Sequence, residues 1–292
     1  MSTKKNFDIY DGMNLMWSDN GEKTYMIAVR QDDVQFMSYE DFDFVSGIYC
    51  WHRRYKFGVN HNFSQQHDFW INAVEKCVPE EDQINYVLEG KISGVSLTTN
   101  GDGTYNMFFD EYPEFFYKKE PEWKILQDIQ NELSDEDCAN LLRPYVEWLP
   151  IWMYDHSGQT ICCGEVNPFN DRFDSGQLGL VIVDKQTMIS EFGCTEDNWR
   201  DKAREIMSAE VNEYNEFIQN NVFGYFLYEF VGEESSDLLD WDNWEEHDPA
   251  IWGFIGSNIY ENGMMESIGC GLQEAIESER YDEVPDFEVS IL

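Results

Sequence analysis

A strand, a long helix and a second strand follow one another between residues 178 and 231, and this succession constrains the fold most. The segment LGLVIVD (178–184) is a continuous apolar run, which is typical of a strand buried on both faces. Thr195 can then cap a helix whose first turn carries Glu196 and Asp197. Apolar residues recur along that helix at Ile206, Val211, Tyr214 and Ile218. The apolar segment VFGYFLYEF (222–230) predicts the second strand.

Other segments predict further strands and shorter helices. KTYMIAVRQ (23–31) has the composition of a strand, and residues 92–109 predict a hairpin. Three segments space their apolar residues as amphipathic helices do: 64–78, 121–133 and 264–278. We expect an α+β fold with a mixed, mainly antiparallel sheet, a few helices and no recognised superfold.

The composition changes along the chain, although no Gly/Ser-rich linker divides it. We expect a β-rich N-terminal region (1–120), a central α+β module (121–231) and an acidic C-terminal region (232–292) packed on the same body. The last region holds 17 acidic residues and one basic residue, Arg280.

The net charge excludes several classes of partner. The chain has 58 acidic and 19 basic residues, for a formal charge of −39. Aromatic residues make up 16% of it, and disordered chains have few of them, so this chain folds. An acidic surface repels nucleic acid and anionic membranes. We therefore expect neither as a partner, and we expect a basic protein surface instead.

The spacing of the cysteines bears on whether the chain binds a cofactor, and the N-terminal residues bear on where the protein is located. The seven cysteines show no CxxC spacing, which gives no support to a zinc ribbon or a thioredoxin-like motif. The first twelve residues lack the apolar run of a signal peptide, and the segment 222–231 is too short to span a bilayer. We expect no metal or other cofactor and a location in the cytoplasm.

The stretch YDHSGQTICCGEVNPFNDRFDSGQLG (154–179) concentrates residue types that occur in catalytic sites. His156 with Cys163 or Ser157 could form the base and nucleophile of a hydrolase, which is one alternative. However, side chains that are neighbours on a strand point to opposite faces, and Ser175 does not lie in a GxSxG turn.

The same stretch has a structural interpretation. Asp155 and Ser157 precede Gly158, and Asp174 and Ser175 precede Gly176. Such side chains form turns before a glycine that tolerates positive φ. We favour this interpretation and assign no catalytic residue.

Two patterns that suggest metal ligands are weak. The loop around Asp102 resembles a calcium-binding loop, but Thr98 and Phe109 occupy positions that require carboxylates, and a hairpin turn explains the loop. His61 and His67 are six residues apart, without the spacing of a zinc motif.

The segment WHRRYK (51–56) groups three of the 19 basic residues: Arg53, Arg54 and Lys56. They can form ion pairs within the acidic chain. Alternatively they form a surface for assembly into a homo-oligomer, because arginine and aromatic residues are enriched in interface cores.

The acidic segment EESSDLLDWDNWEEHD (233–248) alternates carboxylates with Leu, Trp and Ser. It can therefore fold while it displays spaced charges, as a DNA mimic does, and bind the lysines and arginines of a nucleic-acid channel. The predicted partner-binding residues are Asp237, Asp240, Asp242, Glu245, Glu246 and Asp248. The alternative is the general acidic surface of a halophilic protein with an unrelated function.

Five segments in order resemble a family of bacteriophage and mobile-element proteins. They are CWHRRYKFG, LPIWMYDHSG, DSGQLGLVIV, NEYNEFIQNNVFGYFLYE and IWGFIG, within residues 50–275. Phe173 replaces the tryptophan of that pattern, and Cys162-Cys163 replaces small polar residues. The family supplies no catalytic residues to carry over.

The size and acidity also resemble the Gabija anti-defence proteins. That resemblance implies a non-enzymatic inhibitor, encoded by a phage, that forms a homo-oligomer in the host cytoplasm. Its expected partner is a host defence complex of a nuclease and a helicase-like protein, whose DNA binding or cleavage it blocks.

Overall fold

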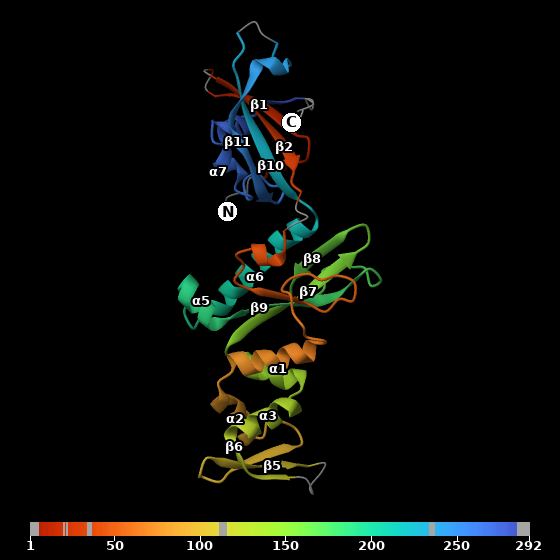
Figure 1. Ribbon diagram of the computed structural model, residues 1–292, viewed down its shortest axis with the longest axis vertical. Helices are drawn as coiled ribbons and strands as arrows, with labels where there is room; N and C mark the ends of the chain where they lie inside the picture. Colours follow the sequence, from red (N-terminus) through yellow and green to blue (C-terminus); the bar gives the residue numbers. More distant parts are fainter. Residues whose placement is uncertain are drawn as a thin grey trace. The chain divides into compact units, whose positions relative to one another are not determined.

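A computed structural model of the chain describes residues 6–19, 21, 23–33, 37–110, 116–233 and 237–284. The chain divides into two compact units (Figure 1). Unit 1 comprises Met1–Ser38, Ser157–Thr160 and Asn212–Leu292, and unit 2 comprises Tyr39–His156 and Ile161–Val211. The described residues form helices and three sheets of mostly antiparallel strands. This confirms the predicted α+β fold class.

Unit 1 is built on a five-stranded antiparallel sheet with the order β11-β10-β2-β1-β12 (Figure 1). The strands are β1 (Asn14–Asp19), β2 (Lys23–Gln31), β10 (Val222–Phe230), β11 (Trp244–Ile255) and β12 (Tyr281–Glu283). The strands predicted at 23–31 and 222–230 are confirmed as β2 and β10, which pair with each other. Both are apolar along most of their length because both faces of the sheet are buried there.

Two short helices cover one face of this sheet. Helices α7 (Met264–Ile268) and α8 (Leu272–Glu277) pack against a cluster that includes Tyr25, Ile27 and Val29 of β2. The prediction of one helix over 264–278 is wrong, because Gly269 and Gly271 take φ values of 63° and 73° between α7 and α8. A residue with positive φ cannot continue a right-handed α-helix, so the two glycines separate α7 from α8.

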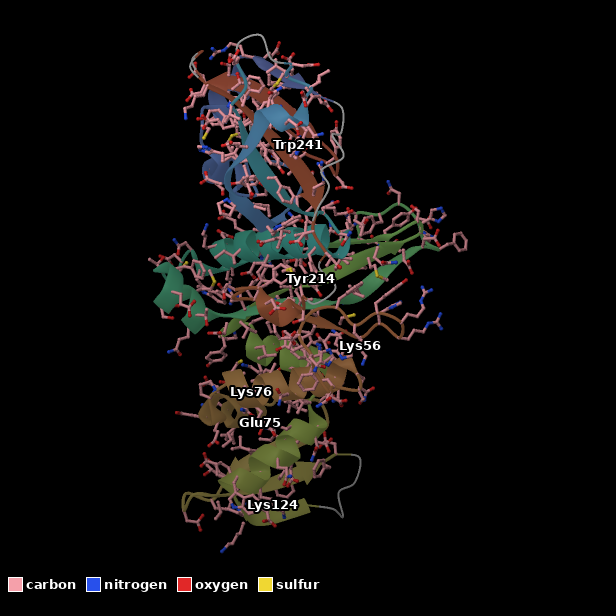
Figure 2. All side chains as sticks on the ribbon, turned by 45° about the horizontal axis from the view of Figure 1, so that its top comes forward. Lys56, Glu75, Lys76, Lys124, Tyr214 and Trp241 are labelled. Carbon is pink, nitrogen blue, oxygen red and sulfur yellow. The ribbon has the colours of Figure 1, made fainter. Side chains whose placement is uncertain are left out.

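The opposite face of the sheet carries a smaller cluster. Met26, Ala28, Tyr228 and Trp244 are buried there, and Trp241, labelled in Figure 2, packs against them. Trp241 begins the short 3-10 helix η2 (Trp241–Asn243), which leads directly into the edge strand β11.

Unit 2 contains a four-stranded sheet with the order β3-β9-β7-β8. The strands are β3 (Gly47–Cys50), β7 (Val146–Asp155), β8 (Gln159–Cys163) and β9 (Ser175–Asp184), and the 3-10 helix η1 (Tyr39–Asp41) precedes them. The first two residues of β8, Gln159 and Thr160, are grouped with unit 1. The buried strand predicted at 178–184 is confirmed as the second half of β9, which lies between β3 and β7.

Two helices follow β9: α5 (Lys185–Phe192) and α6 (Trp199–Ile218), of which the residues from Asn212 onward are grouped with unit 1. The long helix of the prediction is confirmed as α6, but its start is not Thr195. The amide and the hydroxyl of Thr195 both donate to the Oδ1 atom of Asn198, at 2.8 and 3.1 Å. The helix begins at Trp199, directly after Asn198. Within the described residues, no helix is long and apolar enough to cross a bilayer.

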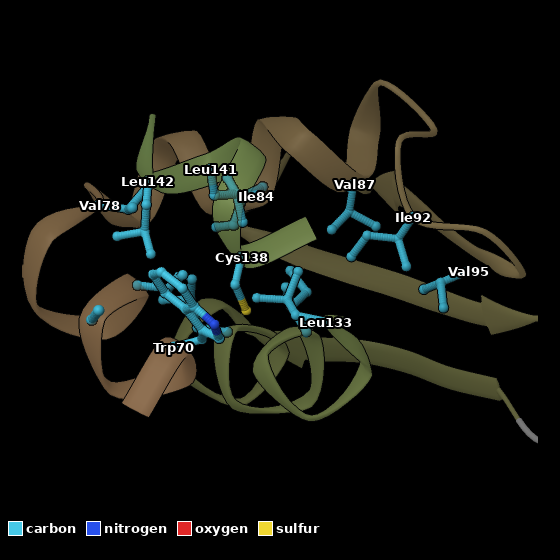
Figure 3. Close-up of a cluster of buried hydrophobic side chains, with 14 of the residues drawn as sticks. Trp70, Val78, Ile84, Val87, Ile92, Val95, Leu133, Cys138, Leu141 and Leu142 are labelled. Atoms are coloured by element: carbon cyan, nitrogen blue, oxygen red, sulfur yellow. The ribbon is translucent and has the colours of Figure 1, made fainter. Parts of the chain in front are cut away.

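The rest of unit 2 joins four helices to a three-stranded sheet. Its elements are α1 (Gln66–Cys77), α2 (Glu80–Leu88), β4 (Val95–Thr99), β5 (Thr104–Phe109), β6 (Phe116–Pro121), α3 (Glu122–Glu132) and α4 (Asp135–Leu142). Their apolar faces meet in one cluster, in which Trp70, Leu133 and Cys138 lie close together (Figure 3). Helices α1 and α3 and the β4–β5 hairpin were predicted from the sequence. Helices α2 and α4 were not, because they are short and begin with runs of acidic residues.

Candidate functional site

Residues from the loop after β3, the end of β7 and the start of β9 meet at one end of the sheet in unit 2. Arg54, in the loop after β3, donates from Nη2 to Oδ2 of Asp155 at 2.7 Å. The hydroxyl of Tyr55 contacts both carboxylate oxygens of Asp155, at 3.1 and 3.0 Å. His156 Nδ1 lies 2.9 Å from Oδ2 of Asp174, which directly precedes β9. Asp155 and His156 thus link the end of β7 to the two other segments.

The hydrolase alternative requires a base in contact with a nucleophile. In the described part of the chain, His156 makes its hydrogen bond to Asp174, and Cys163 makes its own to Ser208 at 3.6 Å. Burial raises the pKa of Cys163, and it raises the pKa of Cys162 to about 11. A raised thiol pKa lowers the concentration of the reactive thiolate. The geometry therefore does not assemble His156 and Cys163 into a nucleophilic pair.

The turn interpretation of Gly158 and Gly176 is wrong in one respect. Neither glycine takes a positive φ, and a Cβ atom added to either would meet nothing within 4 Å. Gly176 belongs to strand β9, where extended backbone suits any residue. Ser175 does form local hydrogen bonds, accepting from Asn167 and donating to the carbonyl of Asp171.

The residues considered as metal ligands have separate partners. His61 Nε2 contacts the carbonyl of Cys50 at 3.0 Å, and His67 Nδ1 lies 2.6 Å from Oδ1 of Asp135. Asp102 Oδ1 accepts from the amide of Thr104 at 3.1 Å, within the turn of the predicted hairpin. In the part of the chain that the structure describes, no group of three or more ligand-type side chains could hold a metal ion.

The basic residues of segment 51–56 differ in whether they form an ion pair within the chain or stay available for an assembly contact. Arg54 forms the internal ion pair with Asp155. Arg53 and Lys56 are exposed and have no ion pair within the described residues; Figure 2 labels Lys56. These two cations are free to contact another molecule.

An aromatic stack orders the loop that carries these cations. The rings of His52 and Tyr55 lie 5.0 Å apart and nearly parallel, and Tyr55 stacks in the same way on Phe57 at 5.4 Å. Burial, followed by the charge of Arg54, lowers the pKa of His52. A neutral His52 favours stacking without adding a charge to the loop.

The acidic segment lies at the edge of the sheet in unit 1. All six predicted residues are exposed, in the turn before β11 or in its first half: Asp237, Asp240, Asp242, Glu245, Glu246 and Asp248. Asp237 accepts a hydrogen bond from the amide of Leu239 at 2.9 Å, and Asp240 accepts one from the amide of Asp242 at 3.2 Å. These bonds hold the turn in place while the second oxygen of each carboxylate stays available.

The register of β11 on β10 assigns the glutamates to different faces. Glu245 pairs with Glu229, Asp248 pairs with Leu227, and Glu246 pairs with Tyr228. Cross-strand partners project to the same face of a sheet. Glu245 and Asp248 therefore lie on the face of Leu227 and Glu246 on the opposite one, so the charges surround the edge.

Few cations compensate this edge. Lys23 Nζ lies 2.8 Å from Glu229, and His247 lies 3.2 Å from Glu229 and 3.7 Å from Asp248. The hydrogen bond from Lys23 lowers the pKa of Glu229. Within the described residues no basic side chain pairs with the five other carboxylates: Asp237, Asp240, Asp242, Glu245 and Glu246. These five carboxylates are available to a basic partner.

A cluster around Glu147, which is joined to Arg200 and Arg204, 53 and 57 residues away, was not predicted from the sequence. No local pattern signals contacts over such distances. Comparisons of the chain with protein families, with curated proteins and with solved structures found no match. The resemblance to bacteriophage proteins stays a prediction.

Proposed function

We propose that this protein is a non-enzymatic inhibitor that binds a basic, nucleic-acid-binding surface of another protein. The contact is the acidic edge of unit 1, defined by Asp237, Asp240, Asp242, Glu245, Glu246 and Asp248. The observation that carries the proposal is that five of these carboxylates are exposed and have no cationic partner within the described residues.

The surroundings of the acidic edge support a protein partner. Leu239 and Trp252 are 56% and 43% exposed, in the turn before β11 and in β11 itself. Apolar side chains among charges allow close packing after charges have steered the first encounter. A purely solvating surface has no need of them.

The family resemblance suggests the class of target. A host defence complex of a nuclease and a helicase-like protein, of the Gabija type, must present a basic channel to DNA, and carboxylates can occupy it in place of phosphates. Such an inhibitor acts in the host cytoplasm.

A homo-oligomer is a second part of the proposal. Arg53 and Lys56 have no ion pair within the described residues, and the stacked loop presents them beside Tyr55 and Phe57. Another copy of this acidic chain supplies carboxylates to both.

The experiment measures binding to a purified Gabija nuclease–helicase complex by surface plasmon resonance. Asp237, Asp240, Asp242, Glu245 and Glu246 are changed together to amides. We expect slower association and a weaker dependence on salt than in the wild type, because exposed charges mainly steer encounter. The wild type should also exclude DNA from the complex.

A matched variant controls for net charge. Glu75 (labelled in Figure 2), Asp110, Glu132, Glu191 and Asp197 are exposed residues of unit 2 without ion pairs in the described part of the chain. Their five amide substitutions change the net charge equally and should leave association unchanged. Equal losses in both variants would show that only total charge matters, and a bound complex that still binds and cleaves DNA would rule out inhibition.

A further inference from the structure

Three of the eight arginines in the chain line one cavity in unit 2. Arg143, Arg200 and Arg204 enclose about 410 Å³ together with Glu147, Trp148 and Glu165. Three guanidinium groups against two carboxylates leave the lining with one positive charge, although the net charge of the chain is −39. An electropositive cavity in so acidic a protein favours an anionic ligand.

A buried carboxylate holds two of the arginines in place. Glu147 is 5% exposed; its Oε2 accepts from Arg200 Nη1 at 2.6 Å, and its Oε1 accepts from Arg204 Nε at 2.7 Å. Arg200 also donates from Nη2 to the carbonyl of Arg143. A guanidinium group is planar, so two fixed bonds set its orientation. The cavity is therefore organised before any ligand arrives.

Several donors in the cavity remain unused. A guanidinium group carries five N–H bonds. Within the described residues, Arg200 Nε and Arg204 Nη1 have no acceptor, since the bonds of these residues use their other nitrogens. The side chain of Arg143 has no hydrogen bond or ion pair there, and it lies over the ring of Trp148 at 5.8 Å. Three arginines from two elements can thus donate to one ligand.

Glu165 marks the position that such a ligand would take. Its carboxylate is 64% exposed and makes one contact here, to Arg204 Nη2 at 3.0 Å. An exposed ion pair of this kind contributes about 1 kcal/mol or less. Glu165 is therefore a weak occupant that a stronger anion can displace.

We infer that this cavity binds a phosphate group, free or as the monoester of a small molecule. A phosphate carries nearly two negative charges and several acceptor oxygens, which matches three arginines better than a single carboxylate does. Arg200 is the second residue of the 20-residue helix α6, whose N-terminal dipole also favours an anion. The volume leaves room for a small organic group beside the phosphate.

The experiment titrates the full-length protein with inorganic phosphate, phenyl phosphate and acetate by isothermal titration calorimetry at low salt. We expect saturable binding of both phosphates with a stoichiometry of one, and at least tenfold weaker binding of acetate. Arg143→Ala should weaken phosphate binding at least tenfold, or about 1.4 kcal/mol. Glu165→Gln should strengthen it severalfold, because it removes the competing carboxylate.

Arg172→Ala is the matched control, since Arg172 is exposed and has no ion pair within the described residues. It should bind phosphate as the wild type does. The proposal is overturned if the wild type shows no saturable phosphate binding or binds acetate equally well. It also fails if Arg172→Ala and Arg143→Ala lose the same affinity, or if Glu165→Gln binds no more tightly. Thermal melting of each variant verifies that it is folded.

Discussion

Arg54 and Asp155 are 101 residues apart in the chain, yet their side chains form a 2.7 Å hydrogen-bonded ion pair. The pair joins the loop after β3 to the end of β7, although these strands are not neighbours in the sheet and both pair with β9. Asp155 is largely buried at 17% exposure, whereas Arg54 is 59% exposed. The contact fixes the basic loop to the sheet.

Removal of this ion pair should have a modest effect. We expect Arg54→Ala to lower the free energy of unfolding by about 1 kcal/mol, because Asp155 keeps its bond from Tyr55 and the arginine is screened by solvent. Arg53→Ala, one residue away and without an ion pair, should have no effect. Urea denaturation monitored by tryptophan fluorescence compares the two, and equal stabilities would show that the Arg54–Asp155 contact does not contribute to stability.

Two glycines of β9 should respond oppositely to substitution. A Cβ atom at Gly179 would lie 1.9 Å from the carbonyl oxygen of Tyr49, so the neighbouring strand β3 must move. We expect Gly179→Ala to cost about 3 kcal/mol. Gly176→Ala meets no atom within 4 Å and should stay within about 0.5 kcal/mol of the wild type. Thermal melting measures both, and a stable Gly179→Ala variant would contradict the close approach of β3 and β9.

The acid stability of unit 1 should depend on Glu229. Its pKa is lowered from 4.5, chiefly by the hydrogen bond from Lys23. A carboxyl whose folded pKa is depressed contributes stability above its unfolded pKa and loses that contribution as the pH falls through the folded pKa. Glu229→Gln should therefore be less stable than the wild type at pH 6, and this difference should vanish as the pH falls from 4.5 through the lowered folded pKa of Glu229.

The cross-strand partner Glu245 provides the control for that experiment. It has no basic partner within the described residues and lies opposite the like charge of Glu229, so Glu245→Gln should be no less stable than the wild type at pH 6. A gap between wild type and Glu229→Gln that persists unchanged at low pH would refute the role of the Lys23 contact.

Assembly can be tested through the two unpaired cations of the basic loop. Arg53→Glu with Lys56→Glu should reduce the oligomeric mass measured by light scattering, because like charges then oppose each other across the contact. Arg172→Glu with Lys76→Glu makes the same change in charge at two other exposed residues and should leave the mass unchanged. A mass that is identical in all three proteins would remove the basic loop from assembly.

Local patterns in the sequence were sufficient for the main elements. The continuous apolar run of β9, the strands β2 and β10 and the long helix α6 were predicted because burial imposes a composition or a period on each segment. The acidic segment was also recognisable, since its charges are consecutive in the chain. Helices α2 and α4 escaped prediction because short helices carry little periodic signal.

Contacts between distant segments were decided only by the tertiary structure. The order β11-β10-β2-β1-β12 brings both ends of the chain into one sheet, and its register sends Glu245 and Glu246 to opposite faces. The break between α7 and α8 at Gly269 and Gly271 interrupts an apolar period that continues through it. Glu147 meets Arg200 and Arg204 only because β7 and α6 pack together in unit 2. A sequence pattern reports which face of a segment is buried, whereas ion pairs across a fold depend on which segments become neighbours.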